Sequence, residues 1–216
     1  MFNFHFELFR PVYPYLFSTN LNHMKKSRLE AFSDGVLAII ITIMVLEMKI
    51  PHGTAWSDLE PILPVFGSYV LSFIYLAIYW NNHHHMFQVV EKVNGAVLWA
   101  NMALLLCLSL IPFTTAWMGE NHFHGNPVAL YGMVLLLAGF SYFLLTLALK
   151  RIHHDESHFA RATADQRKEM VSTILYIIAV VCAFFVEWAS IVIYILVAIM
   201  WVIPDKRMER ILLDNK

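Results

Sequence analysis

Long apolar segments separated by short polar stretches dominate the chain. Most are about twenty residues long, which is the length that an α-helix needs to cross a hydrocarbon core of about 30 Å. Pro112 lies well inside the third segment and is expected to kink it. The pattern predicts an all-α membrane protein with helices over residues 27–49, 59–82, 95–117 and 127–149, and two more within 171–203.

The last apolar run is too long for one ordinary span, because it extends over more than thirty residues. Its only charged residue is Glu187, which lies at the middle of the run. Two short helices that turn at Glu187 and Trp188 explain both features and give six spans. One long tilted helix, giving five spans, is the alternative.

Composition agrees with a chain embedded in lipid. Of its 216 residues, 59% are hydrophobic and 14% charged, and the mean hydropathy is +0.59. In a typical soluble domain about a quarter of the residues are charged. This chain has fewer charged and more apolar residues than one soluble core can bury, so its excess apolar surface must face lipid. The net charge of −1 gives no reason to expect a nucleic-acid partner. Cys107 and Cys182 lie in apolar runs and are predicted to be buried thiols rather than a disulfide or metal site.

The charges between the apolar segments predict an orientation. One end of the predicted bundle carries Lys49 and several acidic residues, and nearly all cations lie at the other end. Cytoplasmic loops carry an excess of lysine and arginine, so we expect a multi-pass protein of the cell (plasma) membrane with both termini in the cytoplasm. The cations at that end are Lys25, Lys26, Arg28, Lys92, Lys150, Arg151, Arg161, Arg167, Lys168, Lys206, Arg207, Arg210 and Lys216.

Residues 24–210 are predicted to form the six-helix transmembrane domain, with a short tail at 211–216. Residues 1–23 are rich in aromatic residues and lack the basic and apolar regions of a signal peptide. Met24 directly precedes a basic stretch and resembles a natural start. Residues 1–23 are therefore either an upstream extension or an interfacial segment.

Catalytic chemistry is not indicated by the apolar segments. They contain no glycine-rich phosphate loop, no nucleophile elbow and no pair of carboxylates inside the membrane, and Asp34 is almost the only ionisable residue in the parts expected to lie within the bilayer. We therefore expect a protein that is not an enzyme and binds no cofactor or metal.

Histidines are numerous, with eleven in the chain. His83, His84 and His85 are consecutive, so on a helix they point about 100° apart and cannot all bind one ion. His154 and His158 have a spacing that suits a metal, but they are predicted to be surface residues of a loop. We expect His83 or His84 to satisfy a buried polar partner such as Ser33 or Asp34.

Four motifs, in the same order along the chain, resemble the transmembrane protein 175 family of endosomal and lysosomal potassium channels and their prokaryotic relatives. The resemblance extends over about residues 25–210. The motifs are Arg28-x-x-x-Phe32-Ser33-Asp34, Tyr79-Trp80-x-x-His83-His84, Leu108-Ser109-Leu110-Ile111-Pro112-Phe113 and Pro204-Asp205-Lys206-Arg207.

This resemblance implies a six-helix subunit whose first helix lines a central pore. Animal members carry two such repeats in a chain, whereas this chain has one, which implies a homotetramer. The family lacks the TVGYG filter of ordinary potassium channels, and no such sequence occurs here. Apolar side chains on the first helix narrow the pore instead, and the first of them corresponds to Ile39.

Helical geometry agrees with this assignment. At about 100° per residue, Thr42 lies about 60° to one side of Ile39, where its hydroxyl could meet a passing ion. Asp34 lies about 140° away and is expected to anchor the helix to its neighbours. Without the resemblance, ordinary packing of the stripe against lipid or another helix would be the favoured interpretation. Its members are Arg28, Gly35, Ile39, Ile43 and Leu46.

The interpretation that follows is a potassium-permeable channel with a hydrophobic constriction that gates and selects ions, in which potassium is the permeant ion. The alternative is a secondary transporter of a cation or small solute that uses Asp34 and the histidines as coupling groups. Val134 is expected to face lipid and to lie outside any contact between subunits.

Overall fold

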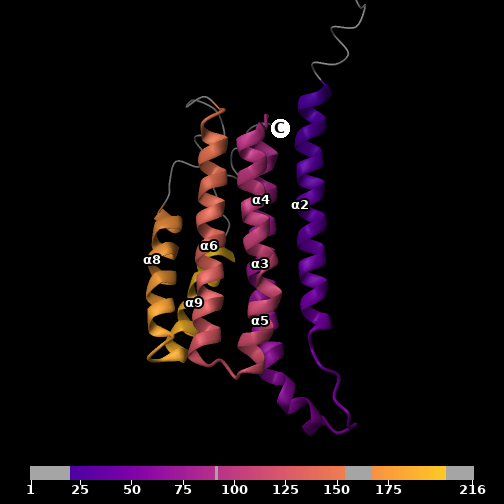
Figure 1. Cartoon of the computed structure of the whole chain (residues 1–216), viewed down its shortest axis with the longest axis vertical. Helices are drawn as coiled ribbons and strands as arrows, with labels where there is room; N and C mark the ends of the chain where they lie inside the picture. Colours follow the sequence, from indigo (N-terminus) through magenta and orange to yellow (C-terminus); the bar gives the residue numbers. More distant parts are fainter. Residues whose placement is uncertain (1–19, 91, 154–166, 203–216) are drawn as a thin grey trace, which may run out of the picture.

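The computed structural model describes residues 20–90, 92–153 and 167–202, and nearly all of this part of the chain is helical (Figure 1). The helices run roughly parallel or antiparallel to one another as a bundle. Their bounds are α2 Asn20–Leu46, the 3-10 helix η1 Trp56–Ile62, α3 Leu63–Val89, α4 Gly95–Ser109, α5 Ile111–Glu120, α6 Gly125–Lys150, α8 Arg167–Cys182 and α9 Glu187–Val202.

Four of the described helical stretches are long and apolar enough to cross a membrane, namely Lys26–Leu46, Trp56–Val89, Gly95–Glu120 and Gly125–Lys150. They correspond to the first four predicted segments. The first ends three residues earlier than predicted, and the other three are longer by a few residues. The prediction of an all-α membrane protein is therefore confirmed. Residues 1–19 and 203–216 lie outside the described residues, so the proposed limits of the transmembrane domain stay a prediction.

The predicted helical hairpin is present, and the five-span alternative is wrong. α8 ends at Cys182 and α9 begins at Glu187, with 16 residues in each helix. The Val186 amide donates to the Cys182 carbonyl at 2.7 Å, which closes the turn. The buried Ser190 hydroxyl donates to the Ala179 carbonyl at 2.7 Å and ties the two helices together.

Pro112 interrupts the third span as predicted. The helix is interrupted at Leu110, so the third span consists of two successive helices, α4 and α5. A proline has no amide hydrogen for the carbonyl four residues earlier, and its ring crowds that carbonyl. Pro112 itself is buried at the start of α5, where a proline is well tolerated.

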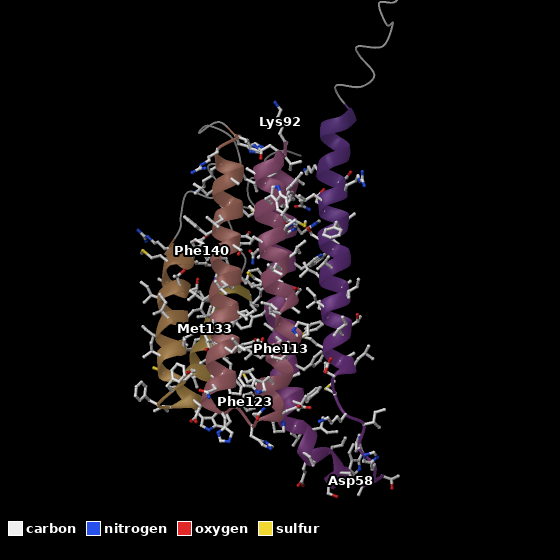
Figure 2. All side chains as sticks on the ribbon, viewed as in Figure 1. Asp58, Lys92, Phe113, Phe123, Met133 and Phe140 are labelled. Carbon is white, nitrogen blue, oxygen red and sulfur yellow. The ribbon has the colours of Figure 1, made fainter. Side chains whose placement is uncertain are left out.

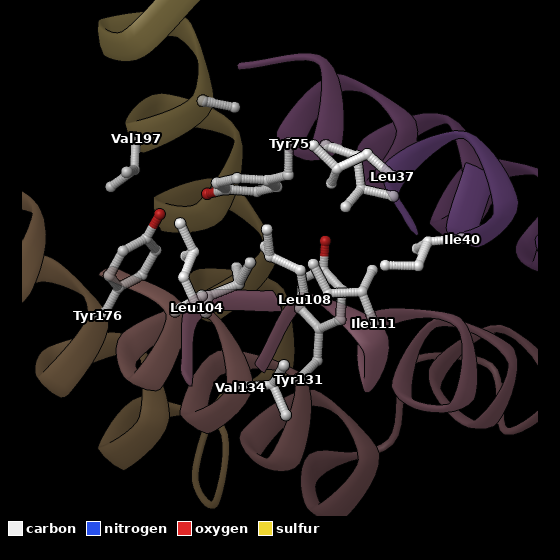
Figure 3. Close-up of a cluster of buried hydrophobic side chains, with 14 of the residues drawn as sticks. Leu37, Ile40, Tyr75, Leu104, Leu108, Ile111, Tyr131, Val134, Tyr176 and Val197 are labelled. Carbon is white, nitrogen blue, oxygen red and sulfur yellow. The ribbon is translucent and has the colours of Figure 1, made fainter. Parts of the chain in front are cut away.

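A cluster of buried tyrosines fills the centre of the bundle (Figure 3). The rings of Tyr75 and Tyr131 meet edge to face with centroids 6.5 Å apart. The Tyr75 hydroxyl donates to the Tyr194 carbonyl at 2.6 Å, which joins α3 to α9. A methyl group at Gly132 would collide with the Tyr194 hydroxyl, so only glycine fits there. Both free cysteines are partly buried and do not form a disulfide.

The two ends of the bundle differ in charge. Lys92 lies at one end and Asp58 at the other (Figure 2). At the Asp58 end, Lys49 pairs with Glu120 at 2.7 Å, linking the segment after α2 to the end of α5. Lys49 is thus held by an acid on its own side, while Lys150 and Arg167 lie at the Lys92 end of α6 and α8.

Candidate pore-lining helix and its anchors

α2 lies at the edge of the bundle, where it packs against α3, α4 and α5 on one side only (Figure 1). The buried side chains of its packed face recur at steps of three or four residues, as expected for one face of an α-helix. They are Leu29, Ser33, Leu37, Ile40 and Met44. Figure 3 shows Leu37 and Ile40 entering the core beside Tyr75, Leu108 and Ile111.

The face of α2 turned away from the bundle is apolar as well. Ile39 is 58% exposed, Ile43 41% and Leu46 79%. Phe32 is also exposed and continues the same line toward the basic end, since it lies seven residues before Ile39. An exposed apolar stripe on a membrane helix must meet lipid, another subunit or a pore. The protomer thus leaves the three predicted constriction residues uncovered.

Thr42 is exposed beside this stripe and bonds back to its own helix. Its hydroxyl lies 2.9 Å from the Ile39 carbonyl and 3.1 Å from the Ala38 carbonyl. A hydroxyl has one hydrogen and two acceptor lone pairs. Because the hydrogen is used within the helix, the oxygen presents its lone pairs outward, which suits contact with a cation.

A buried chain of hydrogen bonds holds α2 to the two helices behind it. The Asn101 side-chain amide of α4 donates to the Ser33 hydroxyl at 2.9 Å, and its carbonyl oxygen lies 2.9 Å from His83 Nε2 of α3. The Ser33 hydroxyl in turn donates to the Leu29 carbonyl at 2.8 Å. All three side chains are buried, so each uses its polar atoms within the protein. His83 therefore reaches Ser33 through Asn101 rather than directly.

Asp34 bonds to a tryptophan and not to a histidine. The indole Nε1 of Trp80 donates to Asp34 Oδ1 at 2.9 Å. His84 stacks on Trp80 with ring centroids 5.6 Å apart, and its Nε2 lies 2.8 Å from the Gln88 amide nitrogen. The sequence thus anticipated an anchoring role for Asp34, but the expected histidine partner is replaced by Trp80.

The basic end of α2 is fastened by a lysine. Lys26 Nζ donates to the Val90 carbonyl at 2.6 Å, just beyond the end of α3. A cation at this position also interacts favourably with the negative end of the helix dipole. Arg28, the first residue of the signature motif, is exposed. The hydrophobic, polar and charged contacts together fix the rotation of α2 about its axis, and so determine which residues face away from the bundle.

Sequence reasoning missed two members of this arrangement. In the sequence, Asn101 is a single polar residue in an apolar segment. Lys26 is one of the cations that indicate which end of the bundle faces the cytoplasm, and nothing more. The spacing of residues along the chain does not reveal the partners of Asn101 and Lys26, because these partners lie in distant parts of the sequence. Among the described residues, no three of His, Cys, Asp and Glu come together in a way that could hold a metal ion. His154 and His158 lie outside the described residues.

Comparison with known proteins gives consistent matches. A protein-family model described as endosomal/lysosomal potassium channel TMEM175 matches residues 28–112. A potassium channel of Chryseobacterium sp. (strain P1-3) is 52% identical over 192 residues, covering 89% of this chain and 100% of the relative. A potassium channel of Streptomyces collinus is 33% identical over 138 residues, covering 60% of this chain and 67% of the relative.

The fold also matches a solved structure, described as the crystal structure of a lysosomal potassium-selective channel TMEM175 homolog from Chamaesiphon minutus. The TM-score is 0.68 at 26% sequence identity, and the match covers 83% of this chain and 97% of that chain. The likeness therefore extends over nearly all of that channel chain.

Proposed function

Because the chain belongs to the TMEM175 family of potassium channels, we propose that it conducts potassium through a pore lined by α2. The observation that carries this proposal is the exposed apolar stripe of Ile39, Ile43 and Leu46, which lies opposite a face of α2 that is firmly anchored to the protomer. A helix packed in this way offers the same outer surface in every copy. The chain is a channel subunit and not an enzyme.

In this proposal the stripe forms the constriction. Rings of apolar side chains can block ions by excluding water from a narrow pore. Ile39, Ile43 and Leu46 follow one another along about 10 Å of helix, which gives stacked apolar rings. Opening then requires the helices to move apart, or the rings to become hydrated.

Thr42 is the proposed contributor to ion selectivity. Its outward lone pairs provide oxygen ligands beside the apolar rings. A ring of such oxygens would replace part of the hydration shell of a cation, which is how oxygen-lined filters admit potassium. Thr42→Ala should therefore change the preference for potassium over sodium, whereas Thr42→Ser should retain it.

One α2 cannot enclose a path for ions, so the proposed channel is a homotetramer with its basic end in the cytoplasm. Closed rings of identical subunits are the usual way to build such an axis. The positive-inside rule places the Lys92 end, and with it both termini, in the cytoplasm of a cell whose plasma membrane holds the channel. The six-helix domain at 24–210 is the proposed channel unit.

The transporter alternative assigns coupling roles to Asp34 and the histidines. Against it, Asp34 is bonded to Trp80 and His83 to Asn101, so both contribute to packing between helices. Purified protein in a planar bilayer separates the two functions. We expect unitary current steps carried by potassium, and saturable coupled exchange without such steps would favour the transporter.

A further inference from the structure

A cavity of about 910 Å³ lies between α3, α6, α8 and α9. Of these helices, α8 and α9 lie on the side of the bundle away from α2 (Figure 1). Ligand sites in proteins typically have volumes of 300–1,000 Å³ and mostly apolar walls with a few polar groups. This cavity has that character. Apolar and aromatic side chains such as Tyr79, Leu136, Phe143 and Ile174 make up much of its wall.

The cavity is elongated along the helices. Its lining on α8 runs from Arg167 to Tyr176, which are nine residues and therefore about 14 Å apart along the helix axis. That length is about half of a hydrocarbon core of about 30 Å, or one leaflet. The shape thus suits an extended acyl chain that enters from one leaflet and stops near the tyrosine cluster.

Polar and charged lining residues gather at the basic end. Arg167 is the first residue of α8, at the end of that helix nearer to Lys92, and Trp201 lies near the end of α9, the other helix of the hairpin. Lys168 Nζ lies over the Trp201 ring, 5.9 Å from its centroid. Glu169 also lines the cavity and is the acid among its described lining residues. Among the described residues at this end, Arg167 and Lys168 outnumber Glu169, so their summed charge is positive.

One wall of the cavity is continuous with the exposed apolar surface of the protomer. Leu137 and Phe140 of α6 are 51% and 56% exposed, and Met170 and Ile174 of α8 are 60% and 51% exposed. All four also line the cavity. A chain can therefore enter sideways between α6 and α8 without crossing a polar barrier.

We propose that this cavity binds an anionic phospholipid of the leaflet at the basic end of the bundle. Its acyl chain lies between α6 and α8 against Tyr142 and Tyr176, and its phosphate lies near Arg167 and Lys168. Tyr142 donates its hydroxyl to the Asn82 carbonyl at 3.3 Å, so its polar atom is already bonded within the protein. This inference does not depend on the proposed channel function.

The test is native mass spectrometry of the purified full chain with phosphatidylglycerol, phosphatidylcholine of the same chains, and palmitate as probes. We expect phosphatidylglycerol to be retained in preference to the other two. Arg167→Gln should weaken its retention about fivefold, which corresponds to about 1 kcal/mol for one basic residue near a lipid phosphate. Glu169→Gln should tighten it, a gain that loss of structure would not produce.

A second pair of variants tests the apolar part of the site. At Gly139, which lines the cavity, an added Cβ would lie 3.8 Å from the Tyr79 hydroxyl, an ordinary contact distance, so we expect the Gly139→Leu side chain to occupy part of the cavity. It should reduce retention of phosphatidylglycerol at least as much as Arg167→Gln. The matched controls are Arg151→Gln at the same end of the bundle and Met133→Leu on α6, neither of which lines the cavity.

Three results would overturn the proposal. Equal loss in Arg151→Gln would mean attraction to the basic surface as a whole. Unchanged retention in Gly139→Leu would mean that the chain does not enter the cavity. Preference for palmitate or phosphatidylcholine over phosphatidylglycerol would mean that the occupant is not an anionic phospholipid. Size-exclusion profiles of the variants confirm that each comparison uses folded protein.

Discussion

The indole of Trp80 donates a 2.9 Å hydrogen bond to the carboxylate of Asp34, joining α3 to the part of α2 that lies about 140° around the helix from Ile39. This relationship assigns Asp34 to the attachment of α2. It also separates the attachment of the helix from the surface that is proposed to face ions. The two can therefore be changed independently by mutation.

Asp34→Ala should damage folding or assembly more than permeation. It removes the acceptor for Trp80, and a hydrogen bond to a charged group contributes about 1.5–3 kcal/mol. We expect this hydrogen bond to contribute a free energy at the lower end of that range, because Trp80 and Asp34 are both exposed in the protomer. Asp34→Asn retains the Oδ1 acceptor and should behave almost like the parent. Size-exclusion of detergent-solubilised protein measures the outcome, and normal assembly with lost conductance would place Asp34 in the ion path.

Ile39→Asn should raise potassium flux several-fold and reduce the preference for potassium. A polar amide hydrates the constriction, so the barrier to ion entry falls. The matched control is Val45→Asn, since Val45 is also exposed on α2 but lies about 120° around the helix from Ile39. Liposome flux assays compare the two. If Ile39→Asn conducts as the parent does, Ile39 is not at the narrowest point.

The helices of this chain could be predicted from the sequence because lipid sets their length and composition. The hairpin at Glu187 followed from the same constraint. Which face of a helix is buried could not be predicted where a segment is apolar all round. Val134 shows this, because it was expected to face lipid and is buried at 4% exposure in the core. Periodicity carries no information when both faces are apolar.

The candidate site likewise has features that the sequence predicts and features that only the fold reveals. The stripe on α2 follows from helical geometry, but its anchors depend on tertiary contacts. Asn101 bonds to Ser33, 68 positions earlier, and to His83, 18 positions earlier. No local sequence pattern indicates such a relationship. A lone asparagine in an apolar segment indicates only that a partner is needed, since an unpaired amide in lipid is costly. The identity of that partner came from the fold.

His122→Gly should stabilise the turn between α5 and α6. His122 has φ 49° and lies at the position after the helix where glycine is preferred. The bonds there are Phe123 N to Met118 O at 3.0 Å and His122 N to Gly119 O at 3.2 Å, the pattern of a Schellman motif. Relief of the left-handed conformation is worth about 1 kcal/mol, which raises the unfolding midpoint by about 2–4 °C.

The control for this turn is His124→Gly. His124 has φ −61°, so glycine relieves no left-handed conformation there, and the added backbone freedom of glycine in the unfolded chain should keep the unfolding midpoint from rising. Thermal unfolding in detergent, followed by tryptophan fluorescence, measures both variants. An equal rise in the two would show that loss of a histidine, and not relief at the left-handed position, explains the effect.

Assembly around a central axis would bring copies of Ile39 close together. Ile39→Cys, with Cys107 and Cys182 replaced by serine, should form disulfides between subunits under mild oxidation. A disulfide requires Cα atoms within about 7 Å, so only neighbouring α2 helices, or helices that move transiently together, qualify. Leu137→Cys is the control, because Leu137 is 51% exposed on α6, where it lines the cavity between α6 and α8 and lies away from α2. A monomer by native mass spectrometry, together with no Ile39→Cys dimer on a gel, would exclude the proposed pore and favour the transporter.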